Sequence, residues 1–130
     1  MPQTRATVFI IDDDASIRRA LGRVMTSEGF DSKGFASVDE FLAGASLMTN
    51  GCIVADMTML GMSSLDLRQL LNNAGSNLPV IFVTAQDTDE VRSAAREAGA
   101  AGFFRKPVDT QALLDAIQWT FDNPRLAKSA

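Results

Sequence analysis

Hydrophobic residues follow two alternating patterns along this chain. Short continuous apolar runs, such as residues 8–11 and 52–55, predict strands that are buried on both faces. Apolar residues spaced three to four positions apart, such as Ile17, Leu21 and Val24, predict helices with one apolar face. The chain is therefore predicted to be a series of strand–helix units.

The two patterns divide the chain into five strands and five helices. The strands are predicted at residues 8–11, 30–35, 51–56, 78–83 and 101–105. Four helices are predicted at residues 15–28, 64–74, 87–98 and 109–121, and another opens at a capping box in residues 37–40. The second strand is predicted to be more exposed than the others, because Asp31 and Lys33 alternate with small residues.

Turn and cap residues set the expected boundaries. A glycine follows each of three predicted helices, at Gly29, Gly75 and Gly99. Asp87 and Glu90 have the spacing of a second capping box, and Asp109 is the predicted N-cap of the last helix. We expect residues 1–122 to form one domain and residues 123–130 to begin a linker or form a C-terminal tail.

Strict βα alternation predicts a parallel sheet covered by helices on both faces. Right-handed crossovers leave few topologies, and the commonest for five strands is the flavodoxin-like order 2-1-3-4-5. The predicted fold class is thus α/β, a flavodoxin-like (βα)5 three-layer sandwich. Ligands bind such sheets at the carboxyl ends of the strands, beside the point where the strand order reverses.

Composition narrows the possible functions. The chain has 130 residues, of which 46% are hydrophobic and 22% charged, and its net charge is −4. This acidic balance argues against direct contact with nucleic acid or with an anionic membrane. No stretch reaches the length of a membrane span, and the N-terminus lacks the pattern of a signal peptide, so a cytoplasmic location is expected.

The sequence contains one cysteine and no histidine. Its single cysteine, Cys52, lies in an apolar run and allows no disulfide framework. There is no histidine, which argues against a zinc site and against Ser-His or Cys-His catalysis. If this protein handles a phosphoryl group by way of a histidine, that histidine belongs to a partner protein.

Carboxylates gather where the first and third strands end. Asp12, Asp13 and Asp14 follow the first strand, and Asp56 ends the third. Such a cluster repels phosphate and attracts a cation, and its oxygen ligands suit Mg²⁺ or Mn²⁺. Helix capping and a favourable helix dipole are the simpler interpretation for one or two of the triplet.

A hydroxyl and an ammonium follow the last two strands. Thr84 alone would be interpreted as part of a turn, and Lys106 alone as a solvated lysine. Together with the carboxylates they suit in-line phosphoryl transfer. In that reaction Asp56 attacks phosphorus, while the cation, Lys106 and Thr84 stabilise charge on the phosphoryl oxygens.

These motifs, in this order, resemble the receiver domain of two-component response regulators, and most closely the FixJ-like branch of the LuxR-type regulators. The resemblance covers residues 8–121. It implies that Asp56 accepts phosphate from a sensor histidine kinase. It also implies that Asp12, Asp13, Asp56 and the backbone carbonyl of Thr58 hold Mg²⁺. The resemblance further implies a signalling domain and not an enzyme, because such a domain catalyses only its own phosphorylation and dephosphorylation.

The resemblance also implies how the signal is transmitted. The residue matching Thr84 senses the phosphoryl group, and the residue matching Lys106 pairs with it. The peptide bond between Lys106 and Pro107 is expected to be cis. Phe103 falls on the aromatic switch position and would rotate inward, although a plain core or edge aromatic is an equal alternative. The fourth helix, fifth strand and fifth helix would then form the output face, with dimerisation there on activation.

The sequence departs from the family pattern in the loop after Asp56. Met59-Leu60-Gly61 lacks the usual proline, and Ser64 replaces a common glycine. These changes affect the expected shape of the loop, whereas all the charged groups remain.

Several alternative functions stay open at this stage. The resemblance suggests a DNA-binding, transcription-activating domain after the last helix, but a single-domain regulator or a pseudo-receiver acting through protein contacts is an alternative. A haloacid-dehalogenase-type phosphatase is disfavoured because Thr58 stands where its second aspartate would be. A flavin site is disfavoured because the aspartates would meet the flavin phosphate.

Overall fold

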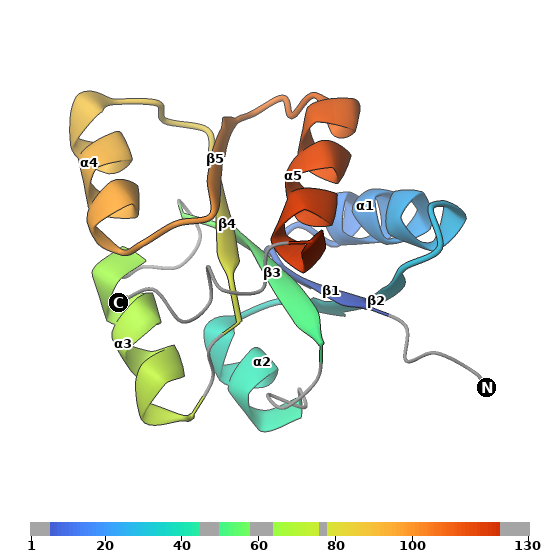
Figure 1. The fold of residues 1–130 in the computed structure, drawn as a ribbon, viewed down its shortest axis with the longest axis horizontal. Coiled ribbons are helices and arrows are strands. Elements are labelled where there is room, and N and C mark those ends of the chain that lie inside the picture. Colours follow the sequence, from blue (N-terminus) through green and yellow to red (C-terminus); the bar gives the residue numbers. More distant parts are fainter. Residues whose placement is uncertain (1–5, 45–49, 58–63, 76–77, 123–130) are drawn as a thin grey trace.

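The computed structural model describes residues 6–44, 50–57, 64–75 and 78–122. Within these residues the chain forms one five-stranded parallel sheet in the order β2-β1-β3-β4-β5 (Figure 1). The strands are β1 (Thr7–Ile11), β2 (Asp31–Phe35), β3 (Gly51–Asp56), β4 (Val80–Thr84) and β5 (Gly102–Arg105). The helices are α1 (Ala15–Ser27), α2 (Val38–Gly44), α3 (Ser64–Asn73), α4 (Asp89–Glu97) and α5 (Thr110–Asp122). The predicted fold class and strand order are confirmed.

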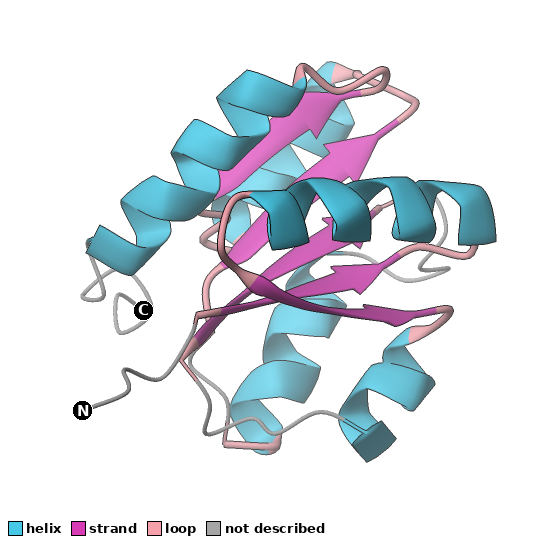
Figure 2. Cartoon of the chain, turned by 90° about the vertical axis from the view of Figure 1, so that its right-hand side faces the viewer, coloured by secondary structure: helices cyan, strands magenta, loops and turns pink. Residues whose placement is uncertain are grey.

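The helices cover both faces of the sheet, which makes three layers (Figure 2). Successive residues of a strand point to opposite faces. In β1, Phe9 and Ile11 therefore join one hydrophobic cluster, and Val8 and Ile10 join another. The first cluster includes residues of α2, α3 and α4, and the second includes residues of α1 and α5.

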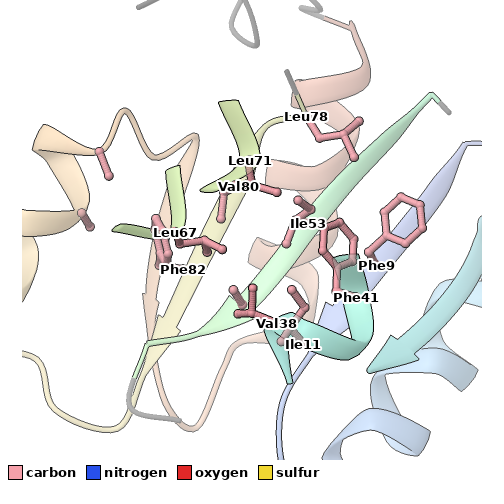
Figure 3. Packing of buried hydrophobic residues seen from close by; sticks show 13 residues of the cluster. Phe9, Ile11, Val38, Phe41, Ile53, Leu67, Leu71, Leu78, Val80 and Phe82 are labelled. Atoms are coloured by element: carbon pink, nitrogen blue, oxygen red, sulfur yellow. The ribbon is translucent and has the colours of Figure 1, made fainter. Parts of the chain in front are cut away.

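Large side chains fill the first cluster closely (Figure 3). The Phe9 and Phe41 rings meet edge to face with centroids 5.4 Å apart, and Leu67 and Leu71 of α3 are completely buried. Aromatic pairs prefer this geometry, and burial of each such side chain contributes about 1.5–3 kcal/mol. The cores on both faces contain residues of β1, β3 and β4, three of the strands whose ends carry the candidate site.

Most helix boundaries agree with the sequence signals. The glycines after α1, α3 and α4 all have positive φ, as the left-handed end of a helix requires. Ser37 accepts a hydrogen bond from the Glu40 amide at 3.1 Å, and Asp109 accepts from the amides at the start of α5. As predicted, β2 is the more exposed strand.

The predicted cap of α4 is wrong. Thr88, and not Asp87, is the N-cap, and its hydroxyl accepts a hydrogen bond from the Val91 amide at 3.2 Å. The Asp87 carboxylate instead pairs with Arg92 on α4. A bidentate pair with a guanidinium is stronger than a hydrogen bond to an amide. Asp87 therefore pairs with Arg92, and the adjacent Thr88 is the N-cap.

The expected tail, residues 123–130, lies outside the described residues, so the domain boundary stays a prediction. Within the part of the chain that the structure describes, none of the helices has the length and apolar character needed to span a membrane.

Candidate functional site

The carboxyl ends of β1 and β3 lie side by side at one edge of the sheet. The two strands pair in register with Ile11 opposite Ala55, which brings together the residues that follow, Asp12 and Asp56. Asp12 is 4% exposed and Asp56 is 6% exposed. Strand order and register thus place two buried carboxylates next to each other, as the flavodoxin-like topology predicts.

Asp13 completes an acidic cluster with these two residues. Asp12, Asp13 and Asp56 can each offer one carboxylate oxygen so that the oxygens lie within 4.8 Å of one another. Asp12 and Asp56 are buried and Asp13 is exposed, so the cluster lies at the surface end of the strands. Only hard oxygen ligands are present in it, which fits Mg²⁺ or Mn²⁺ and not a soft metal. A bound cation would also offset the repulsion among the carboxylates.

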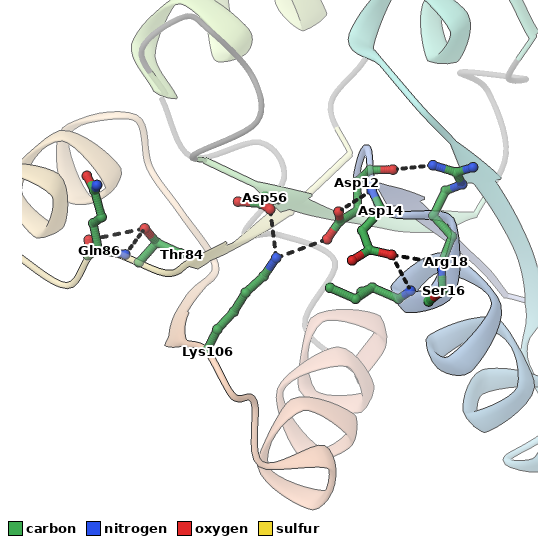
Figure 4. Close-up of polar contacts among 9 residues, drawn as sticks. Asp12, Asp14, Ser16, Arg18, Asp56, Thr84, Gln86 and Lys106 are labelled. Carbon is green, nitrogen blue, oxygen red and sulfur yellow. Dashed lines mark hydrogen bonds and ion pairs between the residues drawn. The ribbon is translucent and has the colours of Figure 1, made fainter.

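Lys106 connects the two buried carboxylates (Figure 4). Its ammonium lies 2.7 Å from Oδ2 of Asp56 and 3.2 Å from Oδ2 of Asp12. Burial lowers the pKa of Lys106, but the hydrogen bonds to Asp56 and Asp12 outweigh it, so the net pKa lies above the ordinary lysine value. The ammonium is therefore charged at neutral pH, in contact with the residue that is predicted to accept phosphate.

The aspartate triplet divides into two roles. Asp14 is the N-cap of α1, and its carboxylate accepts from the Ser16 amide at 2.8 Å and from the Ile17 amide at 3.4 Å. Asp12 uses Oδ1 to accept from the Asp14 amide at 2.9 Å and directs Oδ2 toward Lys106. Capping therefore explains one member of the triplet, and the other two face Asp56.

Arg18 was not predicted as part of this region. Its Nη1 donates to the backbone carbonyl of Asp12 at 2.6 Å, and its aliphatic part lies against Gly34 of β2. The contact fixes the turn between β1 and α1. From the sequence alone, an arginine one turn into an amphipathic helix gives no sign of this bond.

Thr84 ends β4 and is 1% exposed. Its hydroxyl donates to the Gln86 carbonyl at 3.1 Å and accepts from the Gln86 amide at 3.0 Å. This is the turn that the simpler interpretation of Thr84 predicts. Figure 4 shows Thr84 and Lys106 on neighbouring strand ends, with the threonine hydroxyl directed to the loop before α4.

Phe103 lies on β5, partly buried against the cluster that contains α4. The guanidinium carbon of Arg92 lies 5.6 Å from the centroid of its ring. The ring is thus neither fully in the core nor free at the edge. The peptide bond between Lys106 and Pro107 is cis.

Some predicted features lie outside the described residues. These include Thr58, whose carbonyl was predicted as a metal ligand, and the unusual Met59-Leu60-Gly61 segment. Ser64 begins α3. The structure therefore brings together Asp12, Asp13, Asp56 and Lys106, with Thr84 on the adjacent strand end.

Proteins of known family are similar to this chain in sequence. A sequence profile described as "Response regulator receiver domain" matches residues 8–118. The transcriptional regulatory protein TdiR of Thauera aromatica is 38% identical over 112 residues, which cover 86% of this chain and 49% of TdiR. The transcriptional regulatory protein FixJ of Rhizobium meliloti is 34% identical over 115 residues, which cover 88% of this chain and 56% of FixJ. The chain thus spans about half the length of the curated relatives it matches.

Solved structures of similar proteins have the same fold. FixJ-N superposes with a TM-score of 0.80 at 31% identity, covering 93% of this chain and 97% of that one. The response regulator StyR superposes with a TM-score of 0.82 at 36% identity, covering 95% of this chain and 64% of that one. The resemblance seen in the sequence is therefore confirmed at the level of the whole fold.

Proposed function

The chain belongs to the response regulator receiver family, and from this premise we propose that Asp56 accepts a phosphoryl group from a partner histidine kinase in a Mg²⁺-dependent reaction. The observation that supports it most directly is the contact of Asp56 with Lys106, 2.7 Å apart, inside a cluster of three carboxylates. Membership of the family does not by itself require the three carboxylates and the lysine to be present. In this chain Asp12, Asp13, Asp56 and Lys106 are all present among the described residues.

The chemistry is an in-line displacement. An oxygen of Asp56 attacks phosphorus, and a P–O bond forms as the bond from phosphorus to the donor imidazole nitrogen breaks. The electron pair of that bond stays on the imidazole nitrogen, and because the other ring nitrogen carries and keeps a proton, the imidazole leaves as the neutral base. The product is an acyl phosphate on Asp56 and an unmodified histidine on the partner.

Residues of this chain prepare each part of that step. Asp12, Asp13 and Asp56 would hold the cation, which supplies positive charge beside the phosphoryl oxygens. Lys106 is already charged and already bonded to Asp56, so it can remain paired with the phosphoryl oxygens without a large movement. The carbonyl of Thr58 is proposed as a further ligand on the family resemblance alone.

Phosphorylation would then change the output face. Thr84 would exchange its bonds to the Gln86 backbone for one to the phosphoryl group, and Phe103 would rotate inward. The face formed by α4, β5 and α5 is the proposed site of homodimerisation in the phosphorylated state. Because the curated relatives are named transcriptional regulators and extend well beyond this chain, we propose that the domain controls transcription through a separate DNA-binding domain.

A direct test is incubation with acetyl phosphate and Mg²⁺ followed by intact-protein mass spectrometry. The wild type should gain the mass of one phosphoryl group, and the gain should disappear with EDTA and in Asp56→Asn. Asp115→Asn, on the exposed side of α5, is a matched control that should be modified like the wild type. A wild type that gains no mass, or an Asp56→Asn protein that still gains it, would favour a pseudo-receiver that acts through protein contacts.

A further inference from the structure

Arg92 contacts both Asp87, in the loop after β4, and Phe103 of β5. We propose that Arg92 is a positioning residue for the switch: paired with Asp87 and lying over Phe103, it holds that ring in the arrangement of the unphosphorylated protein. The inference rests on the proposed function, because it concerns how phosphorylation of Asp56 reaches the output face.

The contacts of Arg92 fix its guanidinium on two sides. Nη2 donates to Oδ2 of Asp87 at 2.7 Å, and Nε donates to Oδ1 of the same carboxylate. A two-point pair of this kind sets the plane of the guanidinium and its direction. On its other side the guanidinium carbon lies 5.6 Å from the centroid of the Phe103 ring, within the range of a cation–π contact. The position of Asp87 therefore decides where Arg92 meets the ring.

The position of Asp87 depends in turn on Thr84, next to the phosphorylation site. It follows Gln86 directly, and both the amide and the carbonyl of Gln86 are bonded to the hydroxyl of Thr84. If Thr84 turns toward a phosphoryl group on Asp56, both of these bonds are lost and the segment that carries Asp87 is released. These contacts, with the covalent link from Gln86 to Asp87, form one continuous path from Thr84 to Arg92 and Phe103.

This path makes a thermodynamic prediction. A contact that exists only in the unphosphorylated state lowers the affinity for a ligand that favours the other state. Removing the contact must therefore raise that affinity by the factor by which the contact had lowered it. Asp87 is 14% exposed in its side chain and Arg92 is 55% exposed, so the pair is partly screened by solvent. One exposed ion pair and one exposed cation–π contact together correspond to a change of about five-fold in affinity.

The test uses beryllofluoride with Mg²⁺, which imitates an aspartyl phosphate and binds reversibly. Its dissociation constant is measured by calorimetry for the wild type, Arg92→Ala and Asp87→Asn. Each variant should bind about five-fold more tightly than the wild type, and the double variant should gain no more than the single ones. Arg96→Ala and Glu97→Gln are matched controls on the same helix, exposed in the structure, and should bind like the wild type. Alanine is a good helix former, so Arg92→Ala should remain folded.

A second readout follows the ring itself. With fluorine-labelled phenylalanine, and the Phe103 signal identified by its loss in Phe103→Leu, the unliganded Arg92→Ala protein should shift its signal toward the wild-type beryllofluoride position. Unchanged or weaker beryllofluoride binding by Arg92→Ala, with normal controls, would overturn the proposal for Arg92. Absence of beryllofluoride binding by the wild type would instead contradict the proposed phosphorylation of Asp56, so the two failures are distinguishable.

Discussion

The ammonium of Lys106 donates to a carboxylate oxygen of Asp56 at 2.7 Å, although fifty positions separate the two residues in the chain. The same ammonium lies 3.2 Å from Asp12, so it contacts two of the three carboxylates that could hold a cation. Lysine contributes no metal ligand of its own. Lys106 is thus expected to matter for the phosphoryl group and not for the metal.

We therefore expect Lys106→Ala to bind Mg²⁺ at least as tightly as the wild type. Its affinity for beryllofluoride should fall about ten-fold or more, because a charged hydrogen bond to the ligand is lost. Calorimetric titrations with Mg²⁺ alone, and then with beryllofluoride, separate the two effects. A variant that loses Mg²⁺ binding would show that Lys106 instead holds the carboxylates in place.

The aspartate triplet should separate into a stability residue and a metal residue. Asp14→Ala removes the N-cap of α1 and should lower the free energy of unfolding by about 1 kcal/mol, with little change in Mg²⁺ affinity. Asp13→Ala removes an exposed carboxylate of the cluster and should abolish the Mg²⁺ dependence with little loss of stability. Urea unfolding and a Mg²⁺ titration of both variants check this. An Asp13→Ala protein that titrates like the wild type contradicts the assignment.

The thiol of Cys52 should be unreactive toward alkylating reagents in the folded protein. Burial raises the pKa of its thiol to about 12, and a hydrogen bond with Thr120 offsets this only in part. The thiolate is the reactive form, so alkylation at neutral pH should proceed only as fast as the protein opens. The rate of iodoacetamide labelling, compared with the unfolding rate, tests this. Labelling much faster than opening would mean that the site is accessible.

The same raised pKa gives an alkaline pH dependence with a definite sign. A thiol with a raised folded pKa contributes its full stability below the unfolded value of 9.0, and loses it as pH rises toward about 12. Between about pH 9 and pH 10 the unfolding free energy should decrease, by at most about 1.4 kcal/mol per pH unit from this group. Cys52→Ala should show a flatter profile in that interval when unfolding is measured in urea. Equal slopes for the two proteins would contradict the prediction.

Gly51 is packed too closely for a side chain. A Cβ there would lie 2.7 Å from Cε2 of Phe9 and 3.0 Å from the Thr7 carbonyl oxygen. Gly51→Ala should therefore destabilise the protein by about 1–3 kcal/mol, measured as a lower urea midpoint with an unchanged m-value. Gly102→Ala is the matched control, because its Cβ would meet Ile81 and Phe104 at ordinary distances of 3.4 and 3.5 Å. Similar losses in both variants would indicate that glycine is needed for backbone reasons instead.

Much of the fold followed from local patterns. The third strand was predicted with the bounds that β3 has, Gly51–Asp56, because an apolar run between a glycine and an aspartate leaves little choice. The other elements begin and end within one or two residues of their predicted positions, apart from α2, whose end was not predicted. Hydrophobic periodicity and helix stop signals act over a few residues, so the sequence displays them directly.

The side-chain partners were less predictable. Asp87 was expected to cap α4, but it pairs with Arg92 and the cap passes to Thr88. Arg18 gave no sign that it would bond the Asp12 carbonyl. Competition among several possible donors depends on distances between elements, and these are set only when the elements pack.

The sequence alone determined the α/β alternation and the identity of the residues at the strand ends, and it predicted the order of the strands, because crossover handedness leaves few topologies and one of them is the commonest. Only the tertiary structure decided which aspartate caps α1 and which two face Asp56, and that Lys106 joins Asp12 to Asp56. The physical reason is that topology places backbone ends together, whereas hydrogen bonds form between the side-chain atoms that packing brings within about 3 Å of each other.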